Sequence, residues 1–188
     1  PSGKRDLAAQ RATGEILAFI DDDAFPLPDW LTHAIPNFAD PHVGAVGGPA
    51  VTPLADNLLL QASGAVYQSF LGGGPYAFRY TPGRKREVND YPTCNLLVRK
   101  STFLEAGGFG TEYWPGEDTK LCLAITKQLG KSIIYEPGAV VYHHRRNLFN
   151  GHIKQVASYA LHRGFFVKQF PETSRVPSYF LPSVWLTG

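Results

Sequence analysis

The segment Glu15 to Trp30, EILAFIDDDAFPLPDW, constrains the fold more than any other part of the sequence. An apolar run from Ile16 to Ile20 leads directly into three consecutive carboxylates, and the chain then turns at Pro26 and Pro28. A short apolar run with these flanks predicts a strand buried on both faces, as in a parallel or mixed sheet covered by helices. The C-terminal end of such a strand is where α/β proteins place their ligands.

The three carboxylates, Asp21, Asp22 and Asp23, repel one another and need a cation or hydrogen-bond donors to compensate them. Alternate side chains of an extended segment share a face, so Asp21 and Asp23 are expected to point the same way and Asp22 elsewhere. Two converging oxygen ligands suit Mg²⁺ or Mn²⁺, which keep water and add phosphate oxygens from a substrate. The alternative, from these residues alone, is a solvated acidic turn that caps a helix beginning near Asp29.

The composition describes one globular domain. A chain of 188 residues can bury a substantial core, and its net charge of +2 gives no support for nucleic-acid binding. Cys94 and Cys122 lack C-x-x-C spacing, so we expect buried thiols rather than a disulfide or a zinc site. No apolar run of about 18 residues is present that could span a bilayer. The abrupt start and the absence of methionine favour a piece of a longer chain.

Helix and strand signals alternate along the chain and predict a three-layer α/β domain with a mixed sheet. The expected strands are 15–20, 43–51 with a glycine interruption, 94–99, 132–135 and 139–143. The expected helices are 4–12, 29–38, 56–71, 101–106, 117–129 and 148–169. The segment 72–92 has no clear periodicity and is expected to be a functional or mobile loop.

A second acidic pair, Glu117-Asp118, lies in the first turn of a predicted helix, directly after Pro115-Gly116. Carboxylates at a helix start interact favourably with the helix dipole and cap free amides, so the pair alone could be structural. The preceding aromatic and glycine-rich sequence FGTEYWPG favours a binding loop that delivers a carboxylate into a cleft.

Two histidines, His143 and His144, close a predicted strand and are followed by Arg145 and Arg146. A histidine at a strand end is often only a polar residue with a satisfied hydrogen bond. Adjacent arginines, however, are well suited to binding phosphate.

The order of these motifs resembles that of the family 2 glycosyltransferases, inverting enzymes of the glycosyltransferase-A fold. The resemblance extends from Lys4 to about Phe170, and two blocks carry it, ATGEILAFIDDDAFPLPDWL and GEDTKLCLAITKQLGKSIIYEPGAVVYHH. It implies a three-layer α/β/α fold of that class with a mixed sheet. The fold is expected to be partial, because the family's opening strand, nucleotide-binding helix and second strand have no counterpart here.

The resemblance also implies a metal site and a donor site. The family's D-x-D motif matches Asp21 and Asp23, so both are expected to act on the metal, with Asp21 also near the donor ribose. His143 falls where family members place a metal or phosphate contact. The predicted contacts to the donor diphosphate are Asp21, Asp22, Arg145 and Arg146.

The second acidic pair matches the family's E-D motif. Asp118 is similar to the residue that deprotonates the acceptor hydroxyl, and Glu117 accompanies it in the predicted catalytic site. Two positions of the following helix depart from the family pattern. Lys120 stands where an acidic residue is usual, and Ala124 where an arginine is frequent.

The implied activity is transfer of a hexose from a nucleotide-diphosphate sugar to a glycan or lipid-linked acceptor, with Mg²⁺ or Mn²⁺ as cofactor, in polysaccharide biosynthesis. Two alternatives stay open. The first is a truncated, non-catalytic domain that binds a sugar or a partner. The second is a phosphatase of the haloacid dehalogenase type, which also places D-x-D after a buried strand and uses its first aspartate as a nucleophile.

We expect residues 1–146 to form the C-terminal portion of the catalytic core. Residues 147–188 are expected to form a basic and aromatic helix that leads to a candidate membrane segment, because VPSYFLPSVWLTG is apolar and uncharged after Arg175. Mixed basic and aromatic residues favour an anionic membrane surface. The alternative is a helix that packs its aromatic side chains onto the domain. The resulting expectation is a membrane-associated protein at the cytoplasmic face of a bacterial or archaeal membrane.

Overall fold

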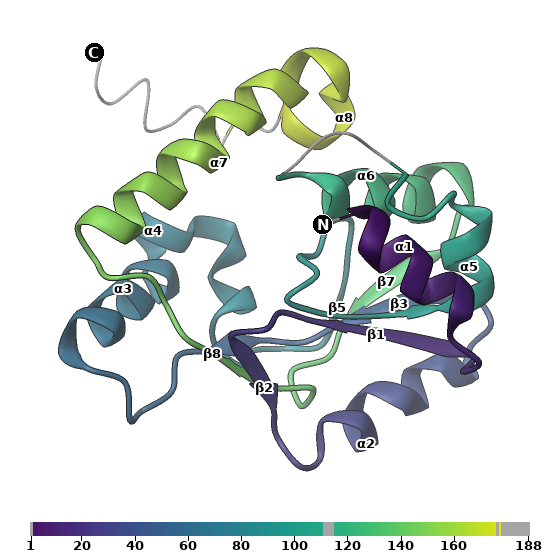
Figure 1. Cartoon of the computed structure of the whole chain (residues 1–188), viewed down its shortest axis with the longest axis horizontal. Helices are drawn as coiled ribbons and strands as arrows, with labels where there is room; N and C mark the ends of the chain where they lie inside the picture. Colours follow the sequence, from purple (N-terminus) through teal and green to yellow (C-terminus); the bar gives the residue numbers. More distant parts are fainter. Residues whose placement is uncertain (1, 111–114, 176, 178–188) are drawn as a thin grey trace.

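The computed structural model describes residues 2–110, 115–175 and 177, and its helices and strands form three layers (Figure 1). Residues 111–114 of the predicted binding loop lie outside the described residues, as does nearly all of the apolar C-terminal stretch.

The larger sheet runs in the order β1-β6-β3-β7-β5. Its strands are β1 (Ile16–Ile20), β6 (Asn95–Arg99), β3 (Val43–Gly47), β7 (Ser132–Tyr135) and β5 (Arg86–Val88). Strand β6 is antiparallel to both β1 and β3, β3 is parallel to β7, and β5 is antiparallel to β7. The predicted mixed sheet is therefore confirmed.

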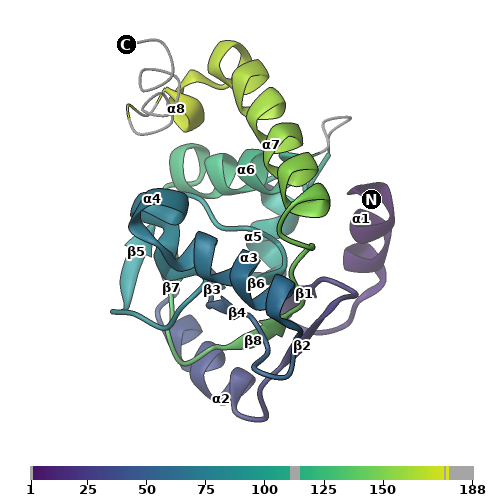
Figure 2. The same ribbon diagram turned by 90° about the vertical axis from the view of Figure 1, so that its left-hand side faces the viewer.

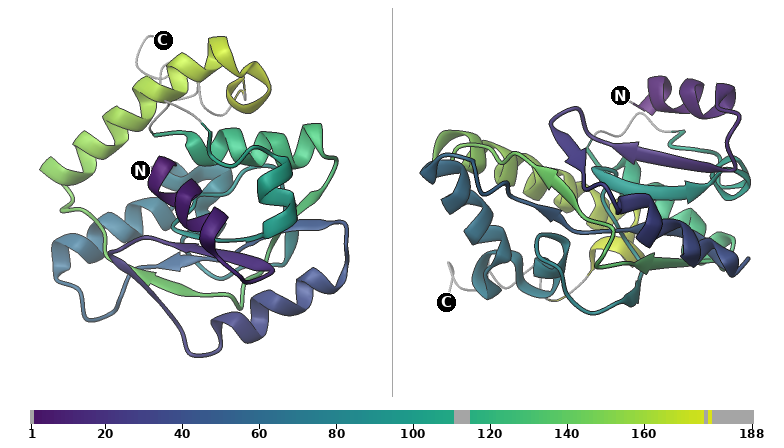
Figure 3. Two further views of the ribbon diagram at one scale, coloured as in Figure 1. Left: turned by 45° about the vertical axis from the view of Figure 1, so that its right-hand side comes forward. Right: turned by 90° about the horizontal axis from the view of Figure 1, so that it is seen from below.

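Helices cover both faces of this sheet, and the alternation along β6 shows why. Leu96 and Val98 enter one buried cluster with residues of α1, α5 and α6, whereas Leu97 enters the other with residues of α2. Figures 1 and 3 show α1 (purple) and α2 (blue-violet) on opposite sides of the sheet. The bounds are α1 (Ser2–Arg11), α2 (Trp30–Ala34), its 3₁₀ continuation η1 (Ile35–Ala39), α5 (Lys100–Glu105), α6 (Glu117–Leu123) and its π-helical continuation η3 (Ala124–Gln128). The three-layer architecture is confirmed.

A smaller sheet has the order β2-β8-β4, with β2 (Ala24–Pro26), β8 (Val141–His143) and β4 (Ala50–Val51). The expected strand 43–51 is interrupted at its glycines, as predicted, but the two parts, β3 and β4, belong to different sheets. A Cβ on Gly47 would collide with the Tyr91 ring, and one on Gly48 would collide with the Ala139 carbonyl. Tyr91 Oη also donates to the Gly48 carbonyl at 2.8 Å. The segment between β3 and β4 is therefore packed too closely for a side chain at either glycine.

A group of helices covers one end of the sheets, as Figure 2 shows from that side. It contains α3 (Leu58–Gln68), α4 (Phe70–Gly73), the 3₁₀ turn η2 (Gly74–Arg79), α7 (Asn150–Gln169) and α8 (Pro171–Ser174). Asn57 caps α3 by accepting hydrogen bonds from two backbone amides of its first turn. Ser69 ends α3 and caps α4, so the expected helix 56–71 is two helices. The expected irregular loop 72–92 is partly wrong, because it contains η2 and β5.

Strand β1 differs from its prediction in burial. It is an edge strand of the described sheet, and its alternation leaves Leu17 buried but Ala18 exposed and Ile20 36% exposed. One face of β1 reaches the core with Leu17 and Phe19, while the other is covered only around Ile16. The prediction of burial on both faces is therefore wrong.

Two further expectations concern the cysteines and membrane-spanning helices. Cys94 and Cys122 are free thiols; Cys122 is buried, as expected, whereas Cys94 is half-buried. Desolvation raises the pKa of the Cys94 thiol to about 12. Among the described residues, no helix has both the length and the apolar character needed to cross a bilayer. The division at residue 146 falls between the end of β8 and the start of α7 and stays a prediction.

Candidate functional site

The carboxylates after β1 are brought to β8 by the smaller sheet. Ala24 of β2 lies opposite His143 of β8 in an antiparallel ladder, and the His144 amide donates to the Asp23 carbonyl at 3.3 Å. This backbone pairing places Asp23 beside His143, with Asp23 Oδ1 at 3.0 Å from His143 Nε2. Residues that are far apart in the sequence thus meet at one edge of the fold.

Asp21, Asp23 and His143 form a cluster with the donor atoms of a metal site. One ligand atom from each lies within 4.8 Å of the other two, and all three residues are half-buried. Burial raises the pKa of Asp21, and the neighbouring Asp23 and Asp22 charges raise it further, although Arg5 and His143 oppose them. Two carboxylates and an imidazole fit a divalent cation, which would stabilise the charged form of both acids.

Arg145 determines the protonation pattern of this histidine. Its Nη1 donates to His143 Nδ1 at 3.0 Å, so the neutral ring carries its proton on Nε2, facing Asp23. Burial, and then the Arg145 charge, lower the pKa of His143, which keeps the ring neutral near pH 7. A cation held through Nε2 would require the other tautomer, and Arg145 would then have to release Nδ1.

The remaining predicted donor contacts occupy different environments. Arg145 points into the protein, where it donates to Thr52 Oγ1 and the Ala50 carbonyl and lies 5.0 Å from the Tyr80 ring centroid. Arg146 is exposed, with Nη2 at 3.8 Å from Asp23 Oδ2. Asp22 is also exposed and, as expected from strand alternation, lies outside the Asp21, Asp23 and His143 cluster.

The second acidic pair begins α6 immediately after Gly116, whose φ of 129° favours glycine. A Cβ at this position would also collide with the ring of Phe166 from α7. Glu117 is buried and accepts a hydrogen bond from the Gly116 amide at 3.1 Å. Asp118 is half-buried, and its Oδ1 accepts from the Thr119 amide at 2.8 Å. The two carboxylates are therefore held differently, with Glu117 turned inward.

Arg5 of α1 connects the two acidic sites. Its Nη2 lies 3.1 Å from Asp21 Oδ1, and its Nη1 lies 3.1 Å from Glu117 Oε1. Nη1 also donates to Thr93 Oγ1 at 3.2 Å, and the guanidinium lies 5.7 Å from the Phe109 ring centroid. The Arg5 guanidinium thus neutralises one carboxylate of each site and fixes the distance between them.

Asp118 has the chemical character of a proton acceptor. Desolvation, followed by the charges of Asp90 and Glu117, raises the pKa of Asp118 to about 7, against the lowering effects of the Thr119 amide and Arg79. A carboxyl group with a pKa near neutrality can accept and release a proton under ordinary conditions.

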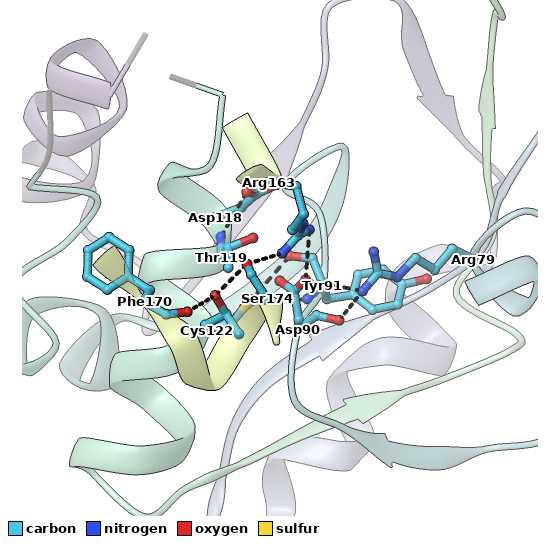
Figure 4. A network of polar contacts seen from close by, with 10 residues as sticks. Arg79, Asp90, Tyr91, Asp118, Thr119, Cys122, Arg163, Phe170 and Ser174 are labelled. Carbon is cyan, nitrogen blue, oxygen red and sulfur yellow. Dashed lines mark hydrogen bonds and ion pairs between the residues drawn. The ribbon is translucent and has the colours of Figure 1, made fainter. Parts of the chain in front are cut away.

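Asp90 is held beside this carboxyl group by two arginines from separate elements (Figure 4). Arg79 Nη2 donates to the Asp90 carbonyl at 2.7 Å and lies 3.5 Å from its Oδ2, while Arg163 Nη2 from α7 lies 3.9 Å from the same Oδ2. Arg163 also donates to Ser174 of α8 at 3.4 Å. Through these contacts, Arg163 connects α7 and α8 to Asp90, which follows β5 and lies near Asp118 of α6.

Sequence reasoning identified the acidic residues and His143, but it missed Arg5, Asp90 and the Arg145 contact to His143. Arg5 lies in a helix of ordinary composition and Asp90 in a segment without periodicity. No local pattern indicates either residue, because their partners come from distant parts of the chain.

Comparisons with known proteins identify the family and the fold of this chain. The sequence profile described as "Glycosyl transferase family 2" matches residues 1–106. The pre-mycofactocin glycosyltransferase of Mycobacterium tuberculosis is 28% identical over 160 residues, which cover 85% of this chain and 33% of that protein. The glucosyl-dolichyl phosphate glucuronosyltransferase of Haloferax volcanii is 27% identical over 158 residues, covering 76% of this chain and 47% of that protein. The chain therefore spans a third to a half of the length of these relatives.

Two solved glycosyltransferase structures share the fold. The mannosyltransferase PcManGT from Pyrobaculum calidifontis, in complex with GDP-Man and Mn²⁺, aligns with a TM-score of 0.58 at 24% identity, over 97% of this chain and 46% of that one. GalNAc-T7 with UDP, GalNAc and Mn²⁺ aligns with a TM-score of 0.56 at 15% identity, over 94% of this chain and 38% of that one. These likenesses establish the glycosyltransferase-A fold.

Replacing Arg5 with Met should destabilise the protein by about 2 kcal/mol or more near neutral pH, because the buried Glu117 carboxylate would lose a cationic partner. The loss should be smaller near pH 4, because burial raises the pKa of Asp21 above its ordinary value of about 4, so that this partner of Arg5 becomes protonated there and no longer needs compensation. Urea unfolding of both proteins at the two pH values measures this difference. The exposed Arg84 provides the control, and an Arg5→Met effect as small as that of Arg84→Met would contradict the bridging role.

Proposed function

Because the chain belongs to glycosyl transferase family 2 and has the glycosyltransferase-A fold, we propose that it supplies the catalytic part of an inverting, metal-dependent glycosyltransferase. The donor is a nucleotide-diphosphate sugar. The observation that supports this most strongly is the pair of acidic sites joined by Arg5, one able to hold a divalent cation and the other a proton acceptor. The phosphatase alternative shares only the D-x-D pattern with this chain and does not account for the family match or the fold.

The metal site in this proposal consists of Asp23, Asp21 and His143. When bound there, Mg²⁺ or Mn²⁺ supplies positive charge for the diphosphate group. Both structural neighbours contain Mn²⁺ with a nucleotide or nucleotide sugar, which supports a divalent ion of this kind. In this proposal the exposed Arg146, which lies near Asp23, contacts the diphosphate, and the exposed Asp22 belongs to the same donor site.

Asp118 acts as the general base. The acceptor hydroxyl gives its proton to the Asp118 carboxylate as its oxygen forms a bond to the anomeric carbon. The bond from that carbon to the diphosphate oxygen breaks, and the nucleoside diphosphate leaves with the electron pair. Glu117 does not take the proton in this scheme, since it is buried and engaged by Arg5; it positions the start of α6.

Arg145 is a positioning residue in this scheme. Before a metal binds, its buried guanidinium holds the His143 ring with the imidazole toward Asp23, and it connects β8 to Thr52 next to β4. Binding of a cation through Nε2 would require Arg145 to release Nδ1 while it keeps its contacts to Thr52 and the Ala50 carbonyl. A direct Arg145 contact to the diphosphate would require this side chain to leave its buried partners.

The acceptor is a glycan or a lipid-linked sugar at the cytoplasmic face of a membrane. A relative from Haloferax volcanii is named for a dolichyl phosphate substrate, and basic and aromatic residues of α7 suit a membrane surface. The alternative of a non-catalytic binding domain predicts no turnover. Incubating the full-length protein with candidate nucleotide sugars and Mn²⁺, and measuring release of nucleoside diphosphate, separates the two functions.

Asp23→Ala should abolish measurable Mn²⁺ binding to the full-length protein, because it removes a carboxylate from the three-residue cluster. Isothermal titration calorimetry measures the affinity, and circular dichroism checks that the fold is kept. Asp22→Ala, which changes the exposed neighbour, is the control and should bind Mn²⁺ with little change. Equal affinities for Asp23→Ala and the unaltered protein would exclude this metal site.

Asp118→Asn should lower turnover by about 100-fold or more, because the amide cannot accept the acceptor's proton. Donor affinity should change little, since the metal cluster is separate. Steady-state kinetics and donor titration of the same preparation test both statements. A parallel loss of donor affinity would instead make Asp118 a donor ligand or a structural cap.

Asp90→Asn should move the low-pH limb of kcat/KM to lower pH. The Asp90 charge raises the pKa of Asp118, so its removal lowers that pKa and leaves the base deprotonated in more acidic solution. A pH profile of kcat/KM measures the shift, with the exposed Asp29→Asn as control. A lower rate with an unmoved limb would show that Asp90 acts only through structure.

A further inference from the structure

Helix α7 leaves several large apolar side chains exposed. Ile153 is 62% and Leu161 76% exposed, and Val156 and Phe165 are exposed as well. The polar His152 is buried. Exposure of this many apolar side chains departs from the usual arrangement of a helix on a domain surface, whose apolar residues face the core.

Helix α3 and the short α4 continue the pattern. Leu58 is 82%, Phe70 85% and Leu71 92% exposed, and Leu59 and Val66 are exposed as well. Residues 57–78, which form these helices and most of η2, contain no charged side chain. Several large exposed apolar residues on neighbouring helices favour an interaction surface over ordinary solvent-facing residues.

Helices α3 and α7 contact each other through polar residues. Ser63 Oγ and His152 Nδ1 are 2.8 Å apart, and Tyr67 Oη donates to Gln155 Oε1 at 3.3 Å. The rings of Tyr67 and His152 also lie 4.8 Å apart between centroids. Ser63 and His152 are buried at this contact, whereas the large apolar residues named above stay exposed. We call the exposed apolar residues of α3, α4 and α7 the outer face; they are Leu58, Leu59, Val66, Phe70, Leu71, Ile153, Val156, Leu161 and Phe165. Figure 2 shows the three helices that carry them.

The charge around the outer face has a single sign. Residues 137–171, which include all of α7, contain no acidic residue, and neither do residues 57–86. Lys154 and Lys168 are both exposed on α7. Apolar side chains bordered only by basic ones are typical of helices that lie in the interface of an anionic bilayer.

We propose that the outer face docks on an anionic membrane and inserts its apolar side chains into the interfacial zone. This inference rests on the proposed function and adds the surface responsible and the orientation of the active site. A second copy of the chain is a less suitable partner for the outer face. In a symmetric dimer the same surface of both copies meets, so Lys154 and Lys168 would face the lysines of the other copy and repel them.

The orientation has a consequence for the acceptor. On the inner side of α7, Phe166 packs against Gly116, directly before Glu117 and Asp118. A helix with its side chains is about 10 Å across, so a membrane along the outer side of α7 lies about one helix diameter from the proposed base. An acceptor whose reactive hydroxyl sits close to a lipid headgroup fits this distance.

Vesicle co-sedimentation of this chain tests the proposal. The chain should sediment with phosphatidylglycerol vesicles at low salt, and less with phosphatidylcholine vesicles or at high salt. The triple variant Leu58→Ser, Phe70→Ser, Leu71→Ser should partition about tenfold or more weaker, since each side chain loses apolar burial. The double variant Lys154→Gln, Lys168→Gln should lose the preference for phosphatidylglycerol. The controls Leu31→Ser and Leu104→Ser, both 49% exposed on other helices, should bind vesicles like the unaltered chain.

The proposal is overturned if the unaltered chain co-sediments with neither vesicle type, or if the triple variant binds vesicles as strongly as the control variants do. Light scattering without lipid adds a further check, because a dimer that the triple variant dissociates would assign the outer face to a second copy. Binding of Mn²⁺ and nucleoside diphosphate is measured on the same proteins. Vesicle binding by a chain that binds neither ligand would support the outer face and count against the proposed transferase, so the two failures are distinguishable.

Discussion

The antiparallel pairing of β2 with β8 is the contact on which the candidate site depends. It sets Ala24 opposite His143 and thereby brings the carboxylates that follow β1 to the imidazole that ends β8. The two strands have only three residues each, so their position relies on the packing around them. Arg145 provides part of that packing by joining β8 to β4 and to the aromatic rings of the helical group.

The second constraint is electrostatic. Several carboxylates converge on this end of the sheet, and most are matched by an arginine from another element. Arg5 pairs with Asp21 and Glu117, Arg146 lies near Asp23, and Arg79 and Arg163 hold Asp90. Asp118 makes no ion pair among the described residues, and desolvation, followed by the charges of Asp90 and Glu117, raises its pKa. The same charge balance that stabilises the fold therefore leaves one carboxyl group able to accept a proton.

Much of this could be predicted from the sequence, and the rest has identifiable physical reasons. The apolar run into Asp21–Asp23 and the glycine before Glu117-Asp118 are local signals, and they located both acidic sites. The two-sided burial of β1 failed, because a strand's own residues do not show whether it lies at an edge. Arg5 was missed because its role depends on two carboxylates distant in the chain. The sequence of α7 shows mixed basic and aromatic residues, but only the tertiary structure shows which of its apolar side chains stay exposed.

The most direct test of the account is the position of a bound metal ion. Crystals of the full-length protein grown with Mn²⁺ and a nucleoside diphosphate can be measured for anomalous scattering at the manganese edge. The account predicts one strong peak within coordination distance of Asp23 and His143, with the Arg145 guanidinium moved away from Nδ1. A well-ordered nucleotide with no manganese peak at these residues, or a peak at other residues, would contradict it.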